Sequence, residues 1–321
     1  MLVLSRAQTE ALLDIDALID ALASAMADLS TGRASAPDRI GALVPEHEGL
    51  LAAMPGYVPS AGMLMSKLVS LYPHNAGGAL PTHQAVIVAF DPGTGQPVAL
   101  LDGTAITAIR TGACSALSAR LLARQDADVL AILGTGVQAR SHARAMCRVR
   151  PIRQIRVAGR DYAKAAALAA ELSETLGTDA QALPAYPEAL RGAGIACATT
   201  HATQPVVRRS WLTPGVHVTS VGYGGREVDD ATVRDALVCV ESRRAALAPY
   251  PTAAATCSNP SAMGSSVSST CTPNWVSSSP GPSRHGSHQI KSPCTSPSAW
   301  RCRTRQPRRW SSPRPASNRQ A

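Results

Sequence analysis

The most constraining feature of this sequence is the stretch 129–146, where an apolar run leads through two glycines into a helix-forming segment. The continuous apolar run Val129–Leu133 is typical of a strand buried on both faces of a parallel sheet. Gly134-Thr135-Gly136-Val137-Gln138-Ala139 follows and matches the pattern G-x-G-x-x-A. In such a turn the first glycine allows a tight bend, the second admits a pyrophosphate, and the helix N-terminus offers N–H groups to the phosphates. The stretch therefore predicts a dinucleotide-binding turn in preference to a purely structural one.

Strands and helices alternate after this turn, which predicts an α/β fold with a doubly wound parallel sheet of Rossmann type. A second strand is expected at 155–158 and a helix at 163–176. Further strands are expected at 195–200, 216–222 and 237–241. We therefore expect a truncated Rossmann domain over residues 125–251.

The residues before the turn predict a mixed α+β domain over 1–124. Apolar positions recur at helical spacing in 6–30, and the segments 50–54, 63–70 and 85–90 read as strands. Residues 91–95 have the composition of a hairpin turn, 98–102 form the returning strand, and 106–124 are helical. After residue 251 we expect a disordered tail, 252–321, rich in Ser, Pro and Arg.

The net charge of +9 comes entirely from the C-terminal part of the chain. Residues 252–321 hold nine of the 31 Lys and Arg side chains and no Asp or Glu, so the remainder carries 22 charges of each sign. A neutral globular part carries no electrostatic signature of nucleic-acid binding. No apolar run reaches the ~18 to 20 residues of a membrane span, and no secretory signal is visible. We expect a cytoplasmic protein without nucleic-acid or membrane partners, and the eight cysteines lack metal-binding spacing.

A series of short motifs runs through the first 251 residues in a characteristic order. They are Pro37-x-Arg39, Met54-Pro55, Lys67-Leu68-Val69-Ser70, Leu80-Pro81-Thr82-His83, Leu101-Asp102-Gly103, Thr107-Ala108-Ile109-Arg110-Thr111-Gly112-Ala113 and the glycine turn. In order and spacing the set resembles the ornithine cyclodeaminase/mu-crystallin family. The resemblance implies a homodimer that uses a nicotinamide cofactor for ornithine cyclodeamination or for reduction of imino and keto acids to amino acids. It also implies that the first domain binds substrate and forms the dimer.

By this resemblance, Arg39 and Arg110 hold the substrate carboxylate, and Lys67 is the catalytic residue beside the reacting carbon. A guanidinium binds a carboxylate through two parallel charge-assisted hydrogen bonds. Arg110 lies in a segment of otherwise small and apolar residues, and Lys67 lies inside an apolar strand. Charges in such places are costly unless they are paired or functional, so we interpret both as site residues rather than surface charges.

The resemblance also assigns residues to the cofactor. They are Thr82, Arg110, Gly134, Thr135, Gly136, Val137, Gln138, Thr200, Val221 and Gly222. The end of the second strand decides which cofactor binds, because NAD sites place Asp or Glu there for the ribose hydroxyls. This chain has Arg160 at that point, and an arginine suits the 2′-phosphate of NADP(H). We expect NADP(H), with NAD(H) left open by the neighbouring Asp161.

The loop after Gly222 departs from the cyclodeaminase pattern. Cyclodeaminases carry an Asp there, whereas this chain has Tyr223-Gly224, and Glu227 is a less favoured substitute. Cyclodeamination needs proton transfer at the δ-amine of ornithine, while imine reduction needs only a hydride, a carboxylate clamp and one acid. We therefore expect reduction of a cyclic or linear imino acid, for example of pyrroline-2-carboxylate type. The alternatives are an ornithine cyclodeaminase and a non-catalytic, mu-crystallin-like NADPH-binding protein.

The tail after Pro251 has neither acidic residues nor a hydrophobic period. Read in another frame through plausible GC-rich codons, 273–279 and 289–306 yield strings that resemble the C-terminal segment of the family. One of them contains a Lys-Ser-x-Gly motif. We infer a frameshift near residues 252–256, against the alternative of a natural basic tail. In the family this segment closes the cofactor site, so its loss would leave apolar surface uncovered.

Overall fold

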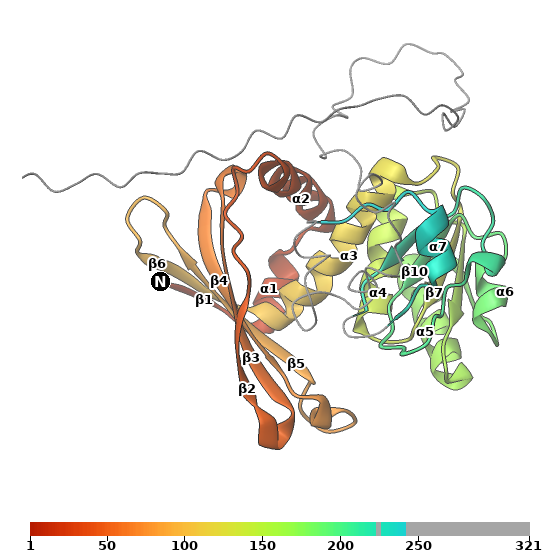
Figure 1. The fold of residues 1–321 in the computed structure, drawn as a ribbon, viewed down its shortest axis with the longest axis horizontal. Helices are drawn as coiled ribbons and strands as arrows, with labels where there is room; N and C mark the ends of the chain where they lie inside the picture. The colour runs from red at the N-terminus through yellow and green to blue at the C-terminus, as the bar shows by residue number, and fades with distance from the viewer. Residues whose placement is uncertain (223–225, 242–321) are drawn as a thin grey trace, which may run out of the picture. The chain divides into compact units, whose positions relative to one another are not determined.

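The computed structural model describes residues 1–222 and 226–241, which form two sheets and their covering helices (Figure 1). The first sheet contains β1 (Leu2–Leu4), β2 (Ile40–Val44), β3 (Gly49–Val58), β4 (Met63–Leu71), β5 (His83–Phe90) and β6 (Pro97–Asp102). The second contains β7 (Val129–Leu133), β8 (Gln154–Ala158), β9 (Asp179–Ala182), β10 (Ile195–Ala198) and β11 (His217–Ser220). The α-helices are α1 (Arg6–Leu12), α2 (Ile15–Ser30), α3 (Gly103–Leu122), α4 (Val137–Val149), α5 (Tyr162–Leu176), α6 (Tyr186–Leu190) and α7 (Asp230–Asp235).

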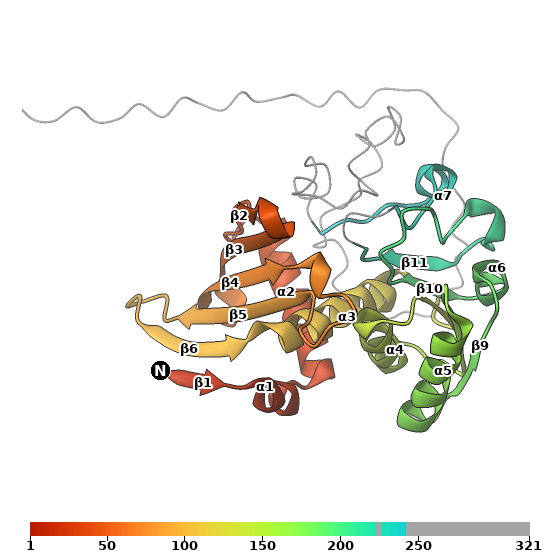
Figure 2. The same ribbon diagram turned by 90° about the horizontal axis from the view of Figure 1, so that it is seen from below.

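The first sheet has the order β1-β6-β5-β4-β3-β2, and all neighbours are antiparallel except β1 and β6. Its turns follow from local chemistry. Between β5 and β6, Asp91 Oδ1 accepts hydrogen bonds from the backbone N–H groups of Gly93 and Thr94, as the expected hairpin turn requires. Helices α1, α2 and α3 lie on one side of this sheet (Figures 1 and 2).

The helix-covered face of the first sheet is packed tightly. Ala52, Val69 and Ala85 from three neighbouring strands are buried there. Gly103 begins α3, and a Cβ at Gly103 would lie 2.9 Å from Cβ of Ala85. Because only glycine permits this approach, the N-terminus of α3 rests directly on β5.

The second sheet has the order β11-β10-β7-β8-β9 and is parallel throughout, which confirms the doubly wound fold. Alternate residues of β7 enter two different clusters. Leu130 and Ile132 pack with residues of α3, α4 and α5, whereas Ala131 and Leu133 pack with α6. A strand covered on both faces needs apolar residues at every position, which is the pattern seen in the sequence.

Helix α3 joins the two sheets. Its C-terminal half contributes Ala113, Ala116 and Leu117 to the core beside β7. It crosses α4 at Gly112, where a Cβ would lie 2.4 Å from Ser141 Oγ. Ser141 Oγ donates a hydrogen bond of 2.7 Å to the carbonyl oxygen of Ala108. The glycine of the Arg-Thr-Gly-Ala motif therefore allows α3 and α4 to pack closely.

The structure corrects several expectations for individual elements. Strands β1, β2 and β9 were not expected, and the expected strand at 237–241 is wrong because that segment is irregular. An apolar run becomes a strand only beside a partner, and β11 is the last strand on that side of the sheet among the described residues. The expected tail at 252–321, its inferred frameshift and the pair Tyr223-Gly224 lie outside the described residues. None of the helices in the described parts of the chain has the length and apolarity that a membrane crossing would require.

Candidate active site

The predicted glycine turn joins β7 to α4. Gly134 has φ +116°, and a Cβ there would lie 2.8 Å from the carbonyl oxygen of Thr199, so a side chain is excluded by both conformation and space. Gly136 differs, because apart from its immediate chain neighbours no atom of the described residues lies within 4 Å of the place where its Cβ would be. The fold thus requires glycine at position 134, whereas the absence of a side chain at position 136 leaves open space beside the turn.

The N-terminus of α4 fits an anionic ligand. Gly136 is its N-cap and supplies no side-chain hydrogen bond, and its first turn has no acidic residue. Helix N-terminal N–H groups in such a setting bind phosphate. Gln138 adds a further signal, since its buried Oε1 accepts no hydrogen bond within the described residues. A bound dinucleotide would fill the space beside Gly136.

Arg140 stabilises the glycine turn through hydrogen bonds to its backbone. Its guanidinium donates to the carbonyl oxygens of Thr135 at 3.0 Å and Gly136 at 3.3 Å. It also pairs with Glu171 on α5 at 2.8 Å. The turn is therefore held in place without a bound ligand.

Other predicted cofactor residues follow the neighbouring strands. Leu133, Ala158, Ala198 and Ser220 are aligned by the strand register, so the residues after them share the carboxyl edge of the sheet. Those residues include the glycine turn, Arg160, Thr200, Val221 and Gly222. This edge, where the strand order reverses, is where doubly wound sheets bind ligands. Arg160 is exposed. Burial raises the pKa of Tyr186, and the positive charge of Arg160 opposes this shift.

Thr82 is not brought to this edge by any described contact. It is exposed just before β5, and its carbonyl oxygen accepts a hydrogen bond of 2.9 Å from Tyr72 N–H. Among the described residues, no hydrogen bond or ion pair connects Thr82 with the second sheet. Its assignment to the cofactor stays a prediction.

The predicted substrate residues form a cationic cluster at the first sheet. Lys67 lies in the central strand β4, on the same face as Val69, and is half-buried. Burial, and next the positive charges of Arg110 and then Arg39, lower the pKa of the Lys67 ammonium to about 8, with Glu241 opposing them. The structure thus brings the three predicted cations close enough to act on one another. A cluster of this kind suits a carboxylate ligand.

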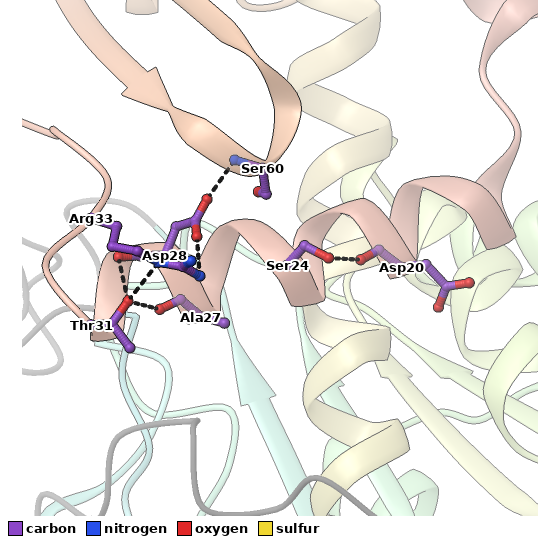
Figure 3. Close-up of polar contacts among 7 residues, drawn as sticks. All are labelled: Asp20, Ser24, Ala27, Asp28, Thr31, Arg33 and Ser60. Atoms are coloured by element: carbon purple, nitrogen blue, oxygen red, sulfur yellow. Dashed lines mark hydrogen bonds and ion pairs between the residues drawn. The ribbon is translucent and has the colours of Figure 1, made fainter.

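A helix cap helps to position Arg110. Asp102 caps α3 by accepting a 2.8 Å hydrogen bond from Ala105 N–H, which fixes the start of the helix that carries Arg110. Near the end of α2, Asp28 connects the helix to the turn between β3 and β4 (Figure 3). There the buried Asp28 accepts a 2.7 Å hydrogen bond from Ser60 N–H and pairs with Arg33 at 2.6 Å. The Ser60 N–H first, and Arg33 as well, keep the pKa of Asp28 low.

The structure adds one residue that the sequence did not assign to the site, and it shows the surroundings of a second that the sequence considered only as a less favoured substitute for the Asp of cyclodeaminases. His83 lies on the same sheet face as Lys67, and burial followed by the charge of Lys67 lowers its pKa. Its place beside Thr82 in a family motif was the available signal. Glu227 is fully buried among the loops at the carboxyl edge of the second sheet. No local pattern predicted that it would be buried.

Comparisons with known proteins agree with this geometry. The family model described as "Ornithine cyclodeaminase/mu-crystallin family" matches residues 1–249. The ketimine reductase mu-crystallin of Mus musculus is 37% identical over 236 residues, which cover 72% of this chain and 74% of that protein. The Δ1-pyrroline-2-carboxylate reductase of Thermococcus litoralis, solved with NADH and L-proline, is 38% identical with a TM-score of 0.74, and the match covers 77% of each chain.

A second solved structure, an archaeal alanine dehydrogenase dimer with bound NAD, is 30% identical with a TM-score of 0.69. The match covers 75% of this chain and 73% of that one. The residues matched by the family model, 1–249, include both sheets, the glycine turn and the cluster of Arg39, Lys67 and Arg110, here called the Lys67 cluster. The chain therefore belongs to the ornithine cyclodeaminase/mu-crystallin family of NAD(P)-dependent enzymes.

Proposed function

We propose that this protein reduces a cyclic or linear imino acid to the corresponding amino acid with NADP(H). The observation that carries the proposal is the Lys67 cluster, in which a half-buried ammonium of pKa about 8 lies near Arg39 and Arg110. Support also comes from the relatives, whose names are ketimine reductase and Δ1-pyrroline-2-carboxylate reductase.

The three cations have complementary tasks in this proposal. Arg39 and Arg110 bind the substrate carboxylate and orient the imine carbon. A bound nicotinamide cofactor supplies the hydride to that carbon. Lys67 donates a proton to the imine nitrogen, and a pKa of about 8 leaves it mostly protonated yet able to transfer its proton near neutral pH. Carbon and nitrogen thus receive one hydride and one proton, which balances the reduction.

The preference for NADP(H) rests on Arg160. It is exposed directly after β8, where a 2′-phosphate would lie. The neighbouring Asp161 caps α5, because its Oδ1 accepts a 3.1 Å hydrogen bond from Lys164 N–H. The preference therefore depends on the charge of Arg160, which suits a phosphate at the tip of the strand.

Glu227 gives a reason to prefer imine reduction over cyclodeamination. It is the carboxylate that could have replaced the Asp of cyclodeaminases, but it accepts four hydrogen bonds from Thr200, Ser220 and Gly222. An ionised carboxylate offers about four acceptor sites, so none remains for a substrate amine.

We also propose that the protein is a homodimer that pairs through the face of the first sheet that the described helices leave uncovered. Ile40, Ala53, Leu68 and Val86 form a row across four neighbouring strands on the face opposite α3. Ile40 is 71% exposed and Val86 is 43% exposed. An exposed apolar surface of this kind is typical of an interaction site, since burying it gains ~25 cal/mol per Å². The archaeal alanine dehydrogenase, a dimer, has a similar fold.

The decisive experiment measures NADPH oxidation with five- and six-membered cyclic imino acids. A parallel assay with ornithine and NAD tests for cyclodeaminase activity.

Arg110→Lys keeps the charge but loses the planar fork, so kcat/KM should fall by roughly 10- to 1000-fold. Arg120→Lys on the same helix is the matched control, since among the described residues the Arg120 guanidinium pairs with Asp20 alone, at the surface and at 2.7 Å. Unimpaired turnover by Arg110→Lys would exclude the clamp. NADPH binding without turnover of any imine would favour a mu-crystallin-like binding protein.

A further inference from the structure

Glu227 is a buried carboxylate at the edge of the second sheet where the cofactor is proposed to bind. Its side chain has 0% exposure, and its backbone carbonyl oxygen accepts hydrogen bonds from the N–H groups of Val206 and Val207, at 2.8 and 2.9 Å. The next residue, Val228, forms an isolated parallel bridge with Val207. These contacts fix the backbone of Glu227, and with it the position from which the carboxylate reaches the strand ends.

The carboxylate connects two strand ends. Oε1 accepts hydrogen bonds from the backbone N–H of Thr200 at 2.5 Å and from its hydroxyl at 2.7 Å. Oε2 accepts from the hydroxyl of Ser220 and from the backbone N–H of Gly222, each at 2.8 Å. Thr200 follows β10, and Gly222 follows β11. Among the described residues no cationic side chain pairs with Glu227, so these hydrogen bonds stabilise it.

Gly222 has no room for a side chain because of this carboxylate. A Cβ at Gly222 would lie 2.6 Å from Cδ and 2.8 Å from Oε2 of Glu227. Backbone and carboxylate therefore fit each other closely at this point. Any displacement of Glu227 must move the Gly222 segment, and any side chain at Gly222 must displace Glu227.

The two segments held by Glu227 lie on one side of the glycine turn. The turn follows β7, Arg160 follows β8, and β10 and β11 lie on the other side of β7. In a doubly wound sheet the dinucleotide crosses the switch point, with its pyrophosphate at the first turn and its adenosine ribose beside the second strand. The nicotinamide half must therefore lie over β10 and β11. This side of the sheet packs closely on the turn, because a Cβ at Gly134 would lie 2.8 Å from the carbonyl oxygen of Thr199.

We propose that Glu227 is a positioning residue that holds the Thr200 and Gly222 segments in the geometry required by the nicotinamide half of the cofactor. The inference rests on the proposed nicotinamide-dependent function and adds to it a residue that touches neither substrate nor cofactor. In this proposal different residues stabilise the two halves of the cofactor site. Arg140 and Glu171 stabilise the turn at the pyrophosphate, and Glu227 stabilises the segments at the nicotinamide.

The test compares two ligands, NADPH and 2′-phospho-ADP-ribose, which lacks only the nicotinamide. Their affinities are measured by titration calorimetry for the parent protein, Glu227→Gln and the matched control Glu188→Gln, whose side chain is exposed on α6. An amide at position 227 loses acceptor sites and sets its NH₂ group against backbone N–H donors. Glu227→Gln should weaken NADPH binding about tenfold or more while changing the affinity of the fragment by less than about twofold. Glu188→Gln should match the parent for both ligands.

Each outcome decides the inference. Equal losses for NADPH and the fragment would show a general structural role, and unchanged NADPH affinity would show that this stabilisation is unnecessary; either result overturns the proposal. If Glu227→Gln does not fold, Ser220→Ala removes a single donor and should show a smaller loss confined to NADPH, with an unselective result counting against the proposal. A parent protein that binds the fragment and NADPH equally well overturns the inference alone. A parent that binds neither overturns the proposed function as well.

Discussion

The hydroxyl of Ser115 on α3 donates a hydrogen bond of 2.9 Å to Nε2 of His142 on α4. The other ring nitrogen, Nδ1, donates to the carbonyl oxygen of Gln138 at 2.7 Å, so the hydrogen-bond network assigns the neutral ring with its proton on Nδ1. His142 is fully buried between the helix that carries Arg110 and the helix that begins at the glycine turn. Its protonation state is therefore coupled to the contact between these helices.

We expect stability to fall in acid because of His142. Burial lowers its pKa from 6.5 to about 4, so the unfolded chain takes up the proton first as the pH falls. The stabilising contribution is complete above pH 6.5 and is lost progressively down to about pH 4, by roughly 3 kcal/mol at about 1.36 kcal/mol per pKa unit. Urea unfolding at a series of pH values measures it.

The control for this prediction is His142→Leu, which cannot titrate. It should be less stable above pH 6.5 because the Ser115 hydroxyl loses its partner, but its stability should decline less between pH 6.5 and 4. His217, whose pKa burial lowers to about 4, contributes equally to both proteins. Parallel pH curves for parent and variant would contradict the assignment.

Activity should decrease as the pH rises through the pKa of Lys67. The group is protonated below about pH 8, so kcat/KM for imine reduction should fall up to about tenfold per pH unit above that value. In Lys67→Arg the cation cannot lose its proton, and this decline should disappear while the rate at pH 7 drops. A decline that persists in Lys67→Arg would assign it to another group.

The two glycines of the turn should respond differently to alanine. Gly136→Ala meets open space and an extended backbone, so the melting temperature should stay unchanged while NADPH affinity falls, because the methyl group occupies the space above the turn. Gly134→Ala, at φ +116° and against the Thr199 carbonyl, should destabilise the fold itself by about 1–3 kcal/mol. Thermal melts paired with NADPH titrations separate the effects, and a Gly136→Ala protein that binds NADPH normally would argue against a phosphate at this turn.

Cofactor preference should depend on Arg160. The parent should bind NADPH more tightly than NADH, and Arg160→Ala should remove the difference by weakening NADPH alone. Arg153→Ala, at an exposed position before β8, is a suitable control. Equal affinities of the parent for both cofactors would reject the preference.

The uncovered face of the first sheet should govern oligomeric state. Val86→Asp places a charge in the centre of the apolar row and should convert a dimer into monomers in sedimentation or light-scattering experiments. Thr94→Asp, in the exposed turn after β5, adds the same charge outside the row and should leave the dimer intact. A dimer that survives Val86→Asp would place the interface elsewhere.

The sequence by itself determined the elements whose signals are local. The glycine turn, the helix after it and the buried β7 were predicted because turn chemistry and hydrophobic period act over a few residues. The family was recognised from motifs that occur in order along the chain, and it is confirmed. The roles of Arg39, Lys67 and Arg110 stay predictions, although the structure places the three charges near one another. The reading of residues 252–321 also stays a prediction from the sequence.

Only the tertiary structure decided the features that depend on distant partners. β1 is three residues long and forms because Val3 pairs with Leu100, a neighbour that no local pattern announces. The segment 237–241 has a strand-like sequence but is irregular in the folded chain. From the sequence Glu227 was only a less favoured substitute for the Asp of cyclodeaminases, yet in the fold it is fully buried and connects two strand ends. Pairing and burial depend on residues far apart in the chain, so these outcomes are set by packing rather than by local sequence.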